Sequence, residues 1–306
     1  MLPEQGRSCS EGGVSVELSG APWGLVSHVA IVEQMHHNLV MEQSIQKIIP
    51  VRGSEIAVDI YGDAEGPAIL LIPGVMADAN AWASVAQGLE GWSAVAVLNR
   101  RGRHPSGPLS STYSLELEVE DALTALRRLP EVRTLFGWSY GALIAMHAAN
   151  ESAVPHLIGY EPIMAPFGAA ALPGLQRAHE SGDLDASVEV ALREVTGMPD
   201  DAVGSLRADN AVWSELRRLS APIHAETRAI NNALRPAGLA GQAQRVDLIV
   251  GERNRGQAPY GTTFQDVADL VPDAVVHVLG GQGHLAHLEA PSKLATFVSA
   301  LGRHSS

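Results

Sequence analysis

The chain has little of what several classes of protein require. Cys9 is the only cysteine among 306 residues, which excludes an intrachain disulfide and fits a reducing cytoplasm. Lysine and arginine number 21 against 34 acidic residues, and this net charge of −13 argues against the basic surface that sequence-independent nucleic-acid binding needs. No apolar run approaches the length of a bilayer span. We therefore expect a cytoplasmic protein that binds neither nucleic acid nor membrane.

The first 44 residues differ in pattern from the rest of the chain. They begin "MLPEQGRSCSEGG", which lacks the basic region, apolar stretch and small-residue cleavage site of a secretory signal. His36 and His37 are adjacent but follow no sustained periodicity, which favours an irregular, solvated segment over a metal site. We treat residues 1–44 as an extension of unknown role.

From Gln46 onward, short apolar segments alternate with helical patterns. The run Ala68–Pro73 is wholly apolar, as in a strand that is buried on both faces. A helix is expected to begin at Ser114, a good N-cap followed by apolar residues on one face. This alternation predicts an α/β fold with a mostly parallel central sheet flanked by helices. We expect strands at residues 47–51, 55–62, 68–73, 93–99, 132–139, 156–162, 246–252 and 274–280.

One long interval interrupts the alternation. Residues 164–239 contain amphipathic helical patterns and no convincing strand, so we expect a helical lid inserted between two strands of a core formed by residues 45–163 and 240–306. Ligands of open α/β folds bind at the carboxyl end of the sheet, which such a lid would cover. Three apolar lid residues are expected to face the site: Trp213, Leu216 and Leu219.

The stretch "LFGWSYG" places Ser139 directly between a predicted strand and a predicted helix. Gly137 and Gly141 flank the serine two residues away on either side, and a nucleophile on a sharp strand-to-helix turn needs such small neighbours. The amides at the start of the following helix would point toward a developing oxyanion. We expect Ser139 to be a nucleophile.

A glycine-containing turn, "LLIPGVMADANAW", follows the first buried strand. The amide of Val75, together with the amide of Tyr140, would make a two-donor oxyanion hole. A plain connection into a helix is the alternative interpretation of this turn.

The loop "LGGQGHLAHLEAP" follows the last predicted strand and contains His284, the candidate base. The chain order of Ser139 before His284 matches the hydrolase arrangement. His287 lies three residues further on, but a zinc site would need a third ligand, so we interpret His287 as structural and expect no metal.

These motifs, in this order, resemble the α/β-hydrolase fold superfamily from about Gln46 to the end of the chain. "LNRRGRHPSG" is similar to an Arg-Gly-rich turn of that family. "GYEPIM", "GDLDASVEVALREVTGMP" and "LGGQGH" resemble a subgroup of small hydrolases that is common in actinobacteria, often near specialised-metabolite pathways. The resemblance implies a serine hydrolase that uses Ser139 and His284 and needs no cofactor.

The acid that such a pair requires is not at the family's usual position. There the chain has Asn254, in "LIVGERNRG", and replacing a triad acid by an amide costs about 10⁴ in turnover. Glu252 lies two residues earlier, and Glu161 ends the preceding strand in "GYEP". Family members are known in which the acid follows that earlier strand, and Pro162 is expected to hold Glu161 in extended backbone at the edge of the sheet.

Glu161 has a second interpretation, as a carboxylate that anchors the lid by pairing with Arg100, Arg101 or Arg103. We favour Glu161 as the displaced acid, with Glu252 and Asn254 as the alternative partners of His284.

Three functions remain open on the sequence. The leading hypothesis is a serine hydrolase that cleaves an ester or related acyl bond of a small, largely apolar molecule through an acyl-enzyme. The second is a lyase or cyclase that acts on a biosynthetic intermediate with the same pair of residues. The third is a catalytically impaired ligand-binding protein on a hydrolase scaffold, in which Asn254 records lost catalysis.

Overall fold

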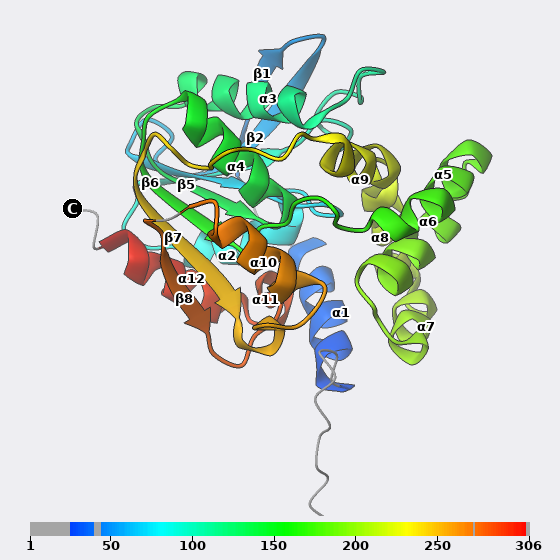
Figure 1. The fold of residues 1–306 in the computed structure, drawn as a ribbon. Helices are drawn as coiled ribbons and strands as arrows, with labels where there is room; N and C mark the ends of the chain where they lie inside the picture. Colours follow the sequence, from blue (N-terminus) through cyan, green and yellow to red (C-terminus); the bar gives the residue numbers. More distant parts are fainter. Residues whose placement is uncertain (1–24, 40–43, 272, 304–306) are drawn as a thin grey trace, which may run out of the picture.

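The computed structural model describes residues 25–39, 44–271 and 273–303, and its centre is one sheet of eight strands (Figure 1). The strands lie in the order β1-β2-β4-β3-β5-β6-β7-β8. The β1–β2 and β2–β4 pairs are antiparallel and the other pairs are parallel, which confirms the predicted mostly parallel sheet. The strands are β1 (Ile45–Val51), β2 (Ser54–Gly62), β3 (Ala68–Ile72), β4 (Ala94–Asn99), β5 (Val132–Trp138), β6 (Val154–Tyr160), β7 (Ala243–Gly251) and β8 (Val275–Leu279).

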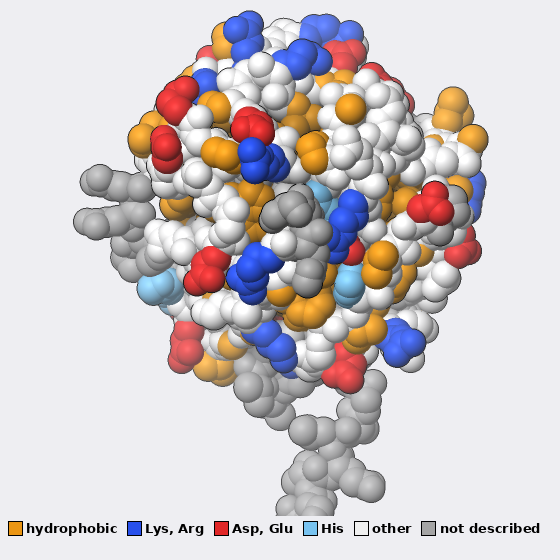
Figure 2. Space-filling view, turned by 90° about the vertical axis from the view of Figure 1, so that its left-hand side faces the viewer, with side chains coloured by type: hydrophobic (Ala, Val, Ile, Leu, Met, Phe, Trp, Pro, Cys, Tyr) orange, Lys and Arg blue, Asp and Glu red, His pale blue; other side chains and the backbone are white. Residues whose placement is uncertain are grey.

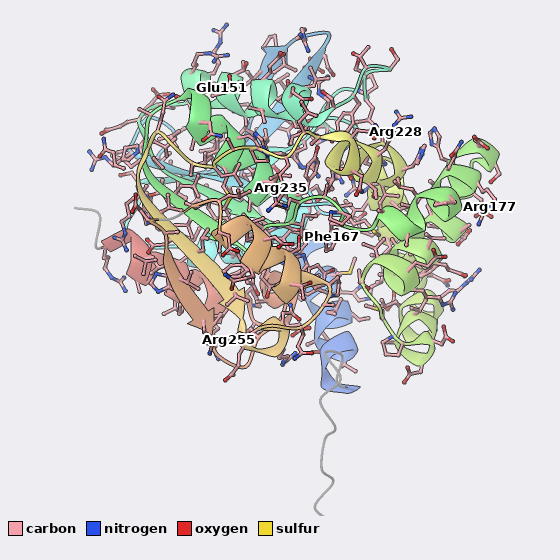
Figure 3. All side chains as sticks on the ribbon, in the orientation of Figure 1. Glu151, Phe167, Arg177, Arg228, Arg235 and Arg255 are labelled. Atoms are coloured by element: carbon pink, nitrogen blue, oxygen red, sulfur yellow. The ribbon has the colours of Figure 1, made fainter. Side chains whose placement is uncertain are left out.

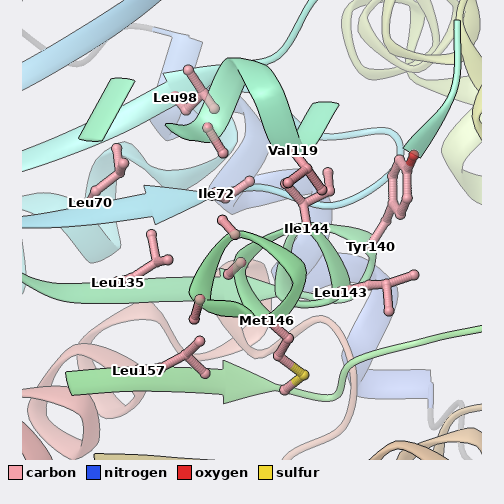
Figure 4. Packing of buried hydrophobic residues seen from close by; sticks show 14 of the residues in the cluster. Leu70, Ile72, Leu98, Val119, Leu135, Tyr140, Leu143, Ile144, Met146 and Leu157 are labelled. Atoms are coloured by element: carbon pink, nitrogen blue, oxygen red, sulfur yellow. The ribbon is translucent and has the colours of Figure 1, made fainter. Parts of the chain in front are cut away.

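Helices cover both faces of this sheet. α3 (Leu115–Arg128), α4 (Tyr140–Glu151) and α10 (Tyr260–Ala268) pack on one face, where Figure 4 shows the apolar side chains of α3 and α4 between the helices and the strands. α2 (Ala83–Gly88) and α12 (Pro291–Arg303) pack on the other. β3 and β4 are buried along their whole length because both of their faces are covered, as the wholly apolar sequence of β3 predicts.

The start of α3 agrees with its sequence signal. The Ser114 hydroxyl accepts a hydrogen bond from the Leu117 amide at 3.3 Å, which satisfies one of the amides that a helix start leaves without an intrahelical acceptor.

A helical insert separates β6 from β7. It contains α5 (Leu172–Ser181), α6 (Leu184–Val190), α7 (Asp200–Ala208), α8 (Asn210–Ser220) and α9 (Ile223–Asn232), with a π-helical turn at Ala191–Val195 and a 3₁₀ turn at Ala169–Ala171. Figure 1 shows these helices to the right of the sheet, and in Figure 3 Phe167 lies where the chain passes from the sheet to the insert.

α1 (Leu25–Leu39) precedes the sheet and packs beside α11 (Ala286–Glu289), α7 and α8. Our prediction of an irregular segment at His36 and His37 is therefore wrong, because residues 25–39 form a helix. The surfaces that hold this helix come from distant parts of the chain, so its neighbours are not evident from the local sequence.

The described surface that Figure 2 shows carries acidic, basic and apolar side chains interspersed with one another. Within residues 25–39, 44–271 and 273–303, no helix is both long and apolar enough to cross a membrane.

Candidate active site

Ser139 lies on a sharp turn between β5 and α4. Its backbone has a φ of 57° and a ψ of −122°, a strained conformation for a residue with a side chain. A Cβ on Gly137 would lie 2.4 Å from the Cα of Ala142, and a Cβ on Gly141 would lie 1.9 Å from the carbonyl oxygen of Ile72. Both glycines of the G-x-S-x-G sequence are therefore required by close backbone packing, as the sequence predicted.

The turn after β3 lies directly against this serine. A Cβ on Gly74 would be 2.8 Å from the Cβ of Ser139, so only glycine lets the two segments approach so closely. Val75 follows and lines the same cavity as Ser139. Tyr140 is the first residue of α4, and the amides of the first turn of a helix have no intrahelical acceptor. The structure thus places Val75 and Tyr140, the two predicted oxyanion donors, next to the serine.

Arg100 fixes the turn after β3 through hydrogen bonds to its backbone. Its guanidinium donates to the carbonyl oxygens of Pro73, at 2.9 Å, and Gly74, at 2.7 Å. The side chain is fully buried and pairs with Glu118 at 2.8 Å and with Glu226 of α9 at 2.5 Å. Because the two carbonyls are fixed, the peptide planes that carry the amides of Gly74 and Val75 are fixed as well.

The three arginines of "LNRRGRHPSG" all have partners other than Glu161. Arg101 pairs with Asp121 at 2.6 Å, and Arg103 pairs with Glu226 at 2.7 Å. The lid-anchoring interpretation of Glu161 through these arginines is therefore wrong.

Glu161 instead lies beside His284. The Nδ1 of His284, in the loop after β8, is 2.7 Å from Oε2 of Glu161, and both side chains are buried. This contact orients the imidazole, because a ring nitrogen that donates to a carboxylate leaves its other nitrogen as an acceptor.

The backbone of Glu161 differs from our expectation. Its φ of 41° lies in the left-handed region, so the extended conformation that we inferred from Pro162 is wrong. This turn places the carboxylate where the Gly251 amide donates to Oε1 at 2.8 Å. Such strain persists only where surrounding contacts fix it, and it commonly occurs at functional sites.

The alternative partners of His284 have other contacts. Asn254 lies on a 3₁₀ turn, Glu252–Asn254, and its Nδ2 donates to both oxygens of Glu161, at 3.0 and 2.9 Å. Glu252 accepts a hydrogen bond from the Gly281 amide at 2.6 Å, on the exposed side of the loop. Asn254 thus contacts the carboxylate that itself contacts His284.

Burial sets the protonation state of His284. Desolvation lowers its pKa, and the hydrogen bond and negative charge of Glu161 oppose this effect only in part, so the pKa lies below the ordinary value of 6.5. The imidazole is therefore neutral at pH 7, which is the form that a general base needs.

Three aromatic residues that the sequence did not single out hold the histidine loop. Tyr260 stacks on the His284 ring with a centroid distance of 3.7 Å. The indole of Trp138 donates to the His284 carbonyl at 2.9 Å, and the Tyr160 hydroxyl donates to the carbonyl of Gly283. Trp138 and Tyr160 are the last residues of β5 and β6, and this position at the strand ends was the one signal available in the sequence.

Ser139 and His284 open on one cavity of about 140 Å³ between the core and the insert. The insert contributes a largely apolar wall that includes Leu192, Val195 and Leu219. Of the three lid residues that we expected to face the site, Leu219 lines the cavity. Trp213 and Leu216 are instead buried in an apolar cluster that also contains Leu192 and Met198. Other apolar residues around the cavity are Met35, Val75, Met76, Ala81, Trp138, Ile163, Phe167, Ala191, Met198, Ile223, Ile230, Tyr260, Leu285 and Leu288.

His287 also lines the cavity but in an apolar setting. Its ring stacks on Trp82 with a centroid distance of 4.8 Å and lies 4.3 Å from the Trp138 ring. Burial, with the nearby His284 as a smaller cause, lowers the His287 pKa to about 3, so the ring is neutral. Within the described residues, no group of three or more His, Cys, Asp or Glu side chains could hold a metal ion.

Solved structures share this fold. The chain is similar to an alpha/beta hydrolase from Sphaerobacter thermophilus, with 23% identity, 83% of this chain and 99% of that chain covered, and a TM-score of 0.67. An esterase from Rhodococcus sp. gives 17% identity, coverage of 86% and 100%, and a TM-score of 0.63. An esterase from Exiguobacterium antarcticum is 16% identical, with 85% of this chain and 100% of that chain covered and a TM-score of 0.67. At these identities the likeness shows the fold alone.

No curated protein is significantly similar to this chain in sequence. The family model described as "Alpha/beta hydrolase family" matches residues 69–297, which is more than half of the chain and includes the turn at Ser139, the insert and the loop of His284. The chain belongs to the alpha/beta hydrolase family.

Proposed function

We infer that the protein is a serine hydrolase that cleaves an ester or related acyl bond of a small, uncharged, largely apolar molecule. The observation that carries this proposal is the pairing of His284 with the buried Glu161 carboxylate at 2.7 Å, in a loop that opens on the same cavity as Ser139. A binding protein that had lost catalysis would have no reason to keep a buried His–Glu pair beside a strained serine turn.

In the proposed reaction each of these groups has one role. Ser139 Oγ attacks the acyl carbon while His284 Nε2 takes the hydroxyl proton, and the negative charge of Glu161 stabilises the imidazolium that forms. The amides of Val75 and Tyr140 donate to the developing oxyanion. His284 returns the proton to the leaving alcohol, and water then attacks the acyl-enzyme by the same steps to release the acid.

The charges of the residues that line the cavity favour an uncharged substrate. Glu215 is the one Asp, Glu, Lys or Arg side chain among the described lining residues, and its carboxylate binds Arg218. His287 is neutral, so no described lining group offers a positive charge to a substrate carboxylate. We assign the insert, residues 164–239, as a lid, because its apolar side chains form part of the wall of the cavity that Ser139 also lines. The esterase names of two similar structures agree with an ester substrate.

The test is hydrolysis of a panel of 4-nitrophenyl esters, from acetate to dodecanoate, by the full chain and by Ser139→Ala. We expect the wild-type chain to hydrolyse the neutral esters and Ser139→Ala to retain no more than the background rate, because alanine lacks the attacking hydroxyl. The variant should still fold, since alanine is smaller than the buried serine that it replaces. Esters of dicarboxylic acids that keep a free carboxylate should be much poorer substrates. Equal turnover by Ser139→Ala would contradict the proposal, and a reactive Ser139 without hydrolysis of any ester would favour elimination or cyclisation.

A further inference from the structure

One wall of the cavity comes from α1, which lies outside the part of the chain that matches the hydrolase family. Met35 and Asn38 line the same cavity as Ser139 and His284, and both α1 side chains are buried. The similar structures are covered over almost their whole length while about one seventh of this chain is not, so the chain has additional segments relative to them.

The inward face of α1 is defined by helical spacing. Ile31, Met35 and Asn38 follow one another at intervals of four and three residues and are all buried. Glu33 and His37 lie on the opposite side and are exposed. α1 is therefore an amphipathic helix whose buried face contributes to the cavity.

Hydrogen bonds attach α1 to the core beside the catalytic cavity. Asn38 Nδ2 donates to the carbonyl of Ala81 at 3.2 Å, and the Ser84 hydroxyl donates to Asn38 Oδ1 at 2.8 Å. Gln34, one turn earlier, donates to the Ser84 hydroxyl at 2.7 Å. Ala81 also lines the cavity, so these bonds fix the helix against a segment of the cavity wall.

The same helix contacts the insert. Ile31 and Met35 pack in one buried cluster with Leu192 and Met198 of the insert, both of which line the cavity. His36 Nε2 lies 2.8 Å from the carboxylate of Asp209, the residue that caps the start of α8. α1 thus contacts both the core and the insert, and its two cavity-lining residues are Met35 and Asn38.

We propose that α1 closes one side of the substrate cavity and that Met35 sets the length of the apolar chain that the site accepts. This inference rests on the proposed hydrolase function and adds to it a substrate class: neutral esters with an unbranched apolar chain that extends from Ser139 toward α1. Met35 acts by shape, since its flexible side chain fills the cavity where the substrate chain ends.

The test compares substitutions of different volume at Met35. Met35→Trp shortens the cavity, and we expect it to lower kcat/KM at least tenfold more for decanoate and dodecanoate 4-nitrophenyl esters than for acetate. Met35→Ala lengthens the cavity and should move the preferred chain length upward by at least two carbons. Glu33→Ala is the matched control, because Glu33 is exposed on the same helix, and it should keep the wild-type chain-length profile.

A binding measurement separates this inference from the proposed function. In the Ser139→Ala background, ethyl esters of the same acids are titrated and followed by the intrinsic tryptophan fluorescence, to which Trp138 in the cavity wall contributes. The Met35 variants should shift the chain-length dependence of the Kd in the same direction as that of kcat/KM. If the wild-type chain hydrolyses no ester but this shift is present, the hydrolase proposal fails and the role of α1 stands.

The outcome that overturns the inference is an unchanged chain-length profile, in turnover and in binding, for folded Met35→Ala and Met35→Trp chains. Circular dichroism reports whether each variant is folded. Met35→Phe carries the same test if Met35→Trp does not fold, because it also reduces the free length of the cavity.

Discussion

Asn254 donates hydrogen bonds to both carboxylate oxygens of Glu161, at 3.0 and 2.9 Å. Asn254 occupies the position where the chain, by its resemblance to the family, is expected to have an acid. Its amide instead binds the acid that is supplied by the end of β6, and Oε2 of that acid is shared with His284. These hydrogen bonds hold the carboxylate in position beside His284, where its negative charge stabilises an imidazolium. The asparagine is compatible with catalysis for this reason.

The charge of Glu161 should dominate turnover. Glu161→Gln keeps the size of the side chain and removes its charge, and we expect kcat to fall by about 10³–10⁴ because the imidazolium of His284 loses its stabilising partner. Steady-state kinetics on a neutral ester measures the effect. Glu252→Gln is the control, since Glu252 contacts the Gly281 amide; it should retain near-normal turnover, and a collapse there with normal turnover in Glu161→Gln would reverse the assignment.

Asn254→Ala should have a much smaller effect on turnover. The carboxylate of Glu161 would still accept from the Gly251 amide and still contact His284, so we expect kcat to fall by about tenfold, which corresponds to about 1.4 kcal/mol. The same ester assay provides the comparison. A loss as large as that in Glu161→Gln would mean that Asn254 has a direct part in proton transfer.

The pH dependence follows from the depressed pKa of His284. Turnover needs the neutral imidazole, so kcat/KM should fall as the pH decreases through a midpoint below 6.5, the ordinary value. In Glu161→Gln the hydrogen bond and charge that raise the His284 pKa are weakened. The midpoint at which the residual kcat/KM falls on the acid side should therefore move to still lower pH. A midpoint at or above 6.5 in the wild-type chain, or an upward shift in Glu161→Gln, would contradict this account of the site.

Most of the fold and several residues of the site could be predicted from local sequence patterns. The apolar run of β3, the glycines around Ser139 and the order of Ser139 before His284 are consequences of nearby packing, so they could be predicted. The φ of 41° at Glu161 and the Asn254 contact depend on the meeting of β6 with the end of β7, which no local signal encodes.

Long-range partners explain what the sequence did not indicate. Arg100 and Glu226 are 126 positions apart, and their buried pairing depends on how α9 packs against the core. α1 was missed for the same reason, because Ile31 and Met35 are buried by the insert, whose arrangement follows from the whole fold.

Glu226 should be important for stability. It is fully buried and pairs with both Arg100, at 2.5 Å, and Arg103, at 2.7 Å. Glu226→Gln leaves two buried guanidinium groups with reduced compensation, and we expect a loss of about 3–5 kcal/mol in the free energy of unfolding, measured by urea denaturation.

The control for Glu226 is the exposed pair of Arg133 and Glu131, whose atoms are 2.9 Å apart. Glu131→Gln should cost less than about 1 kcal/mol, because exposed pairs contribute little. Equal effects of the two substitutions would show that the Glu226 network contributes no more than a surface pair.

Since Arg100 holds the turn before Val75, we also expect Glu226→Gln to lower kcat.

Labelling by a fluorophosphonate tests the central claim most directly, because the reagent reports whether Ser139 is activated by the His284–Glu161 pair. Intact-protein mass spectrometry and peptide mapping of the full chain should show a single adduct on Ser139. Ser139→Ala should give no adduct, and the labelling rate of Glu161→Gln should be at least a hundredfold lower than that of the wild-type chain. No adduct on Ser139 in the folded wild-type chain, or an equal labelling rate in Glu161→Gln, would contradict the account.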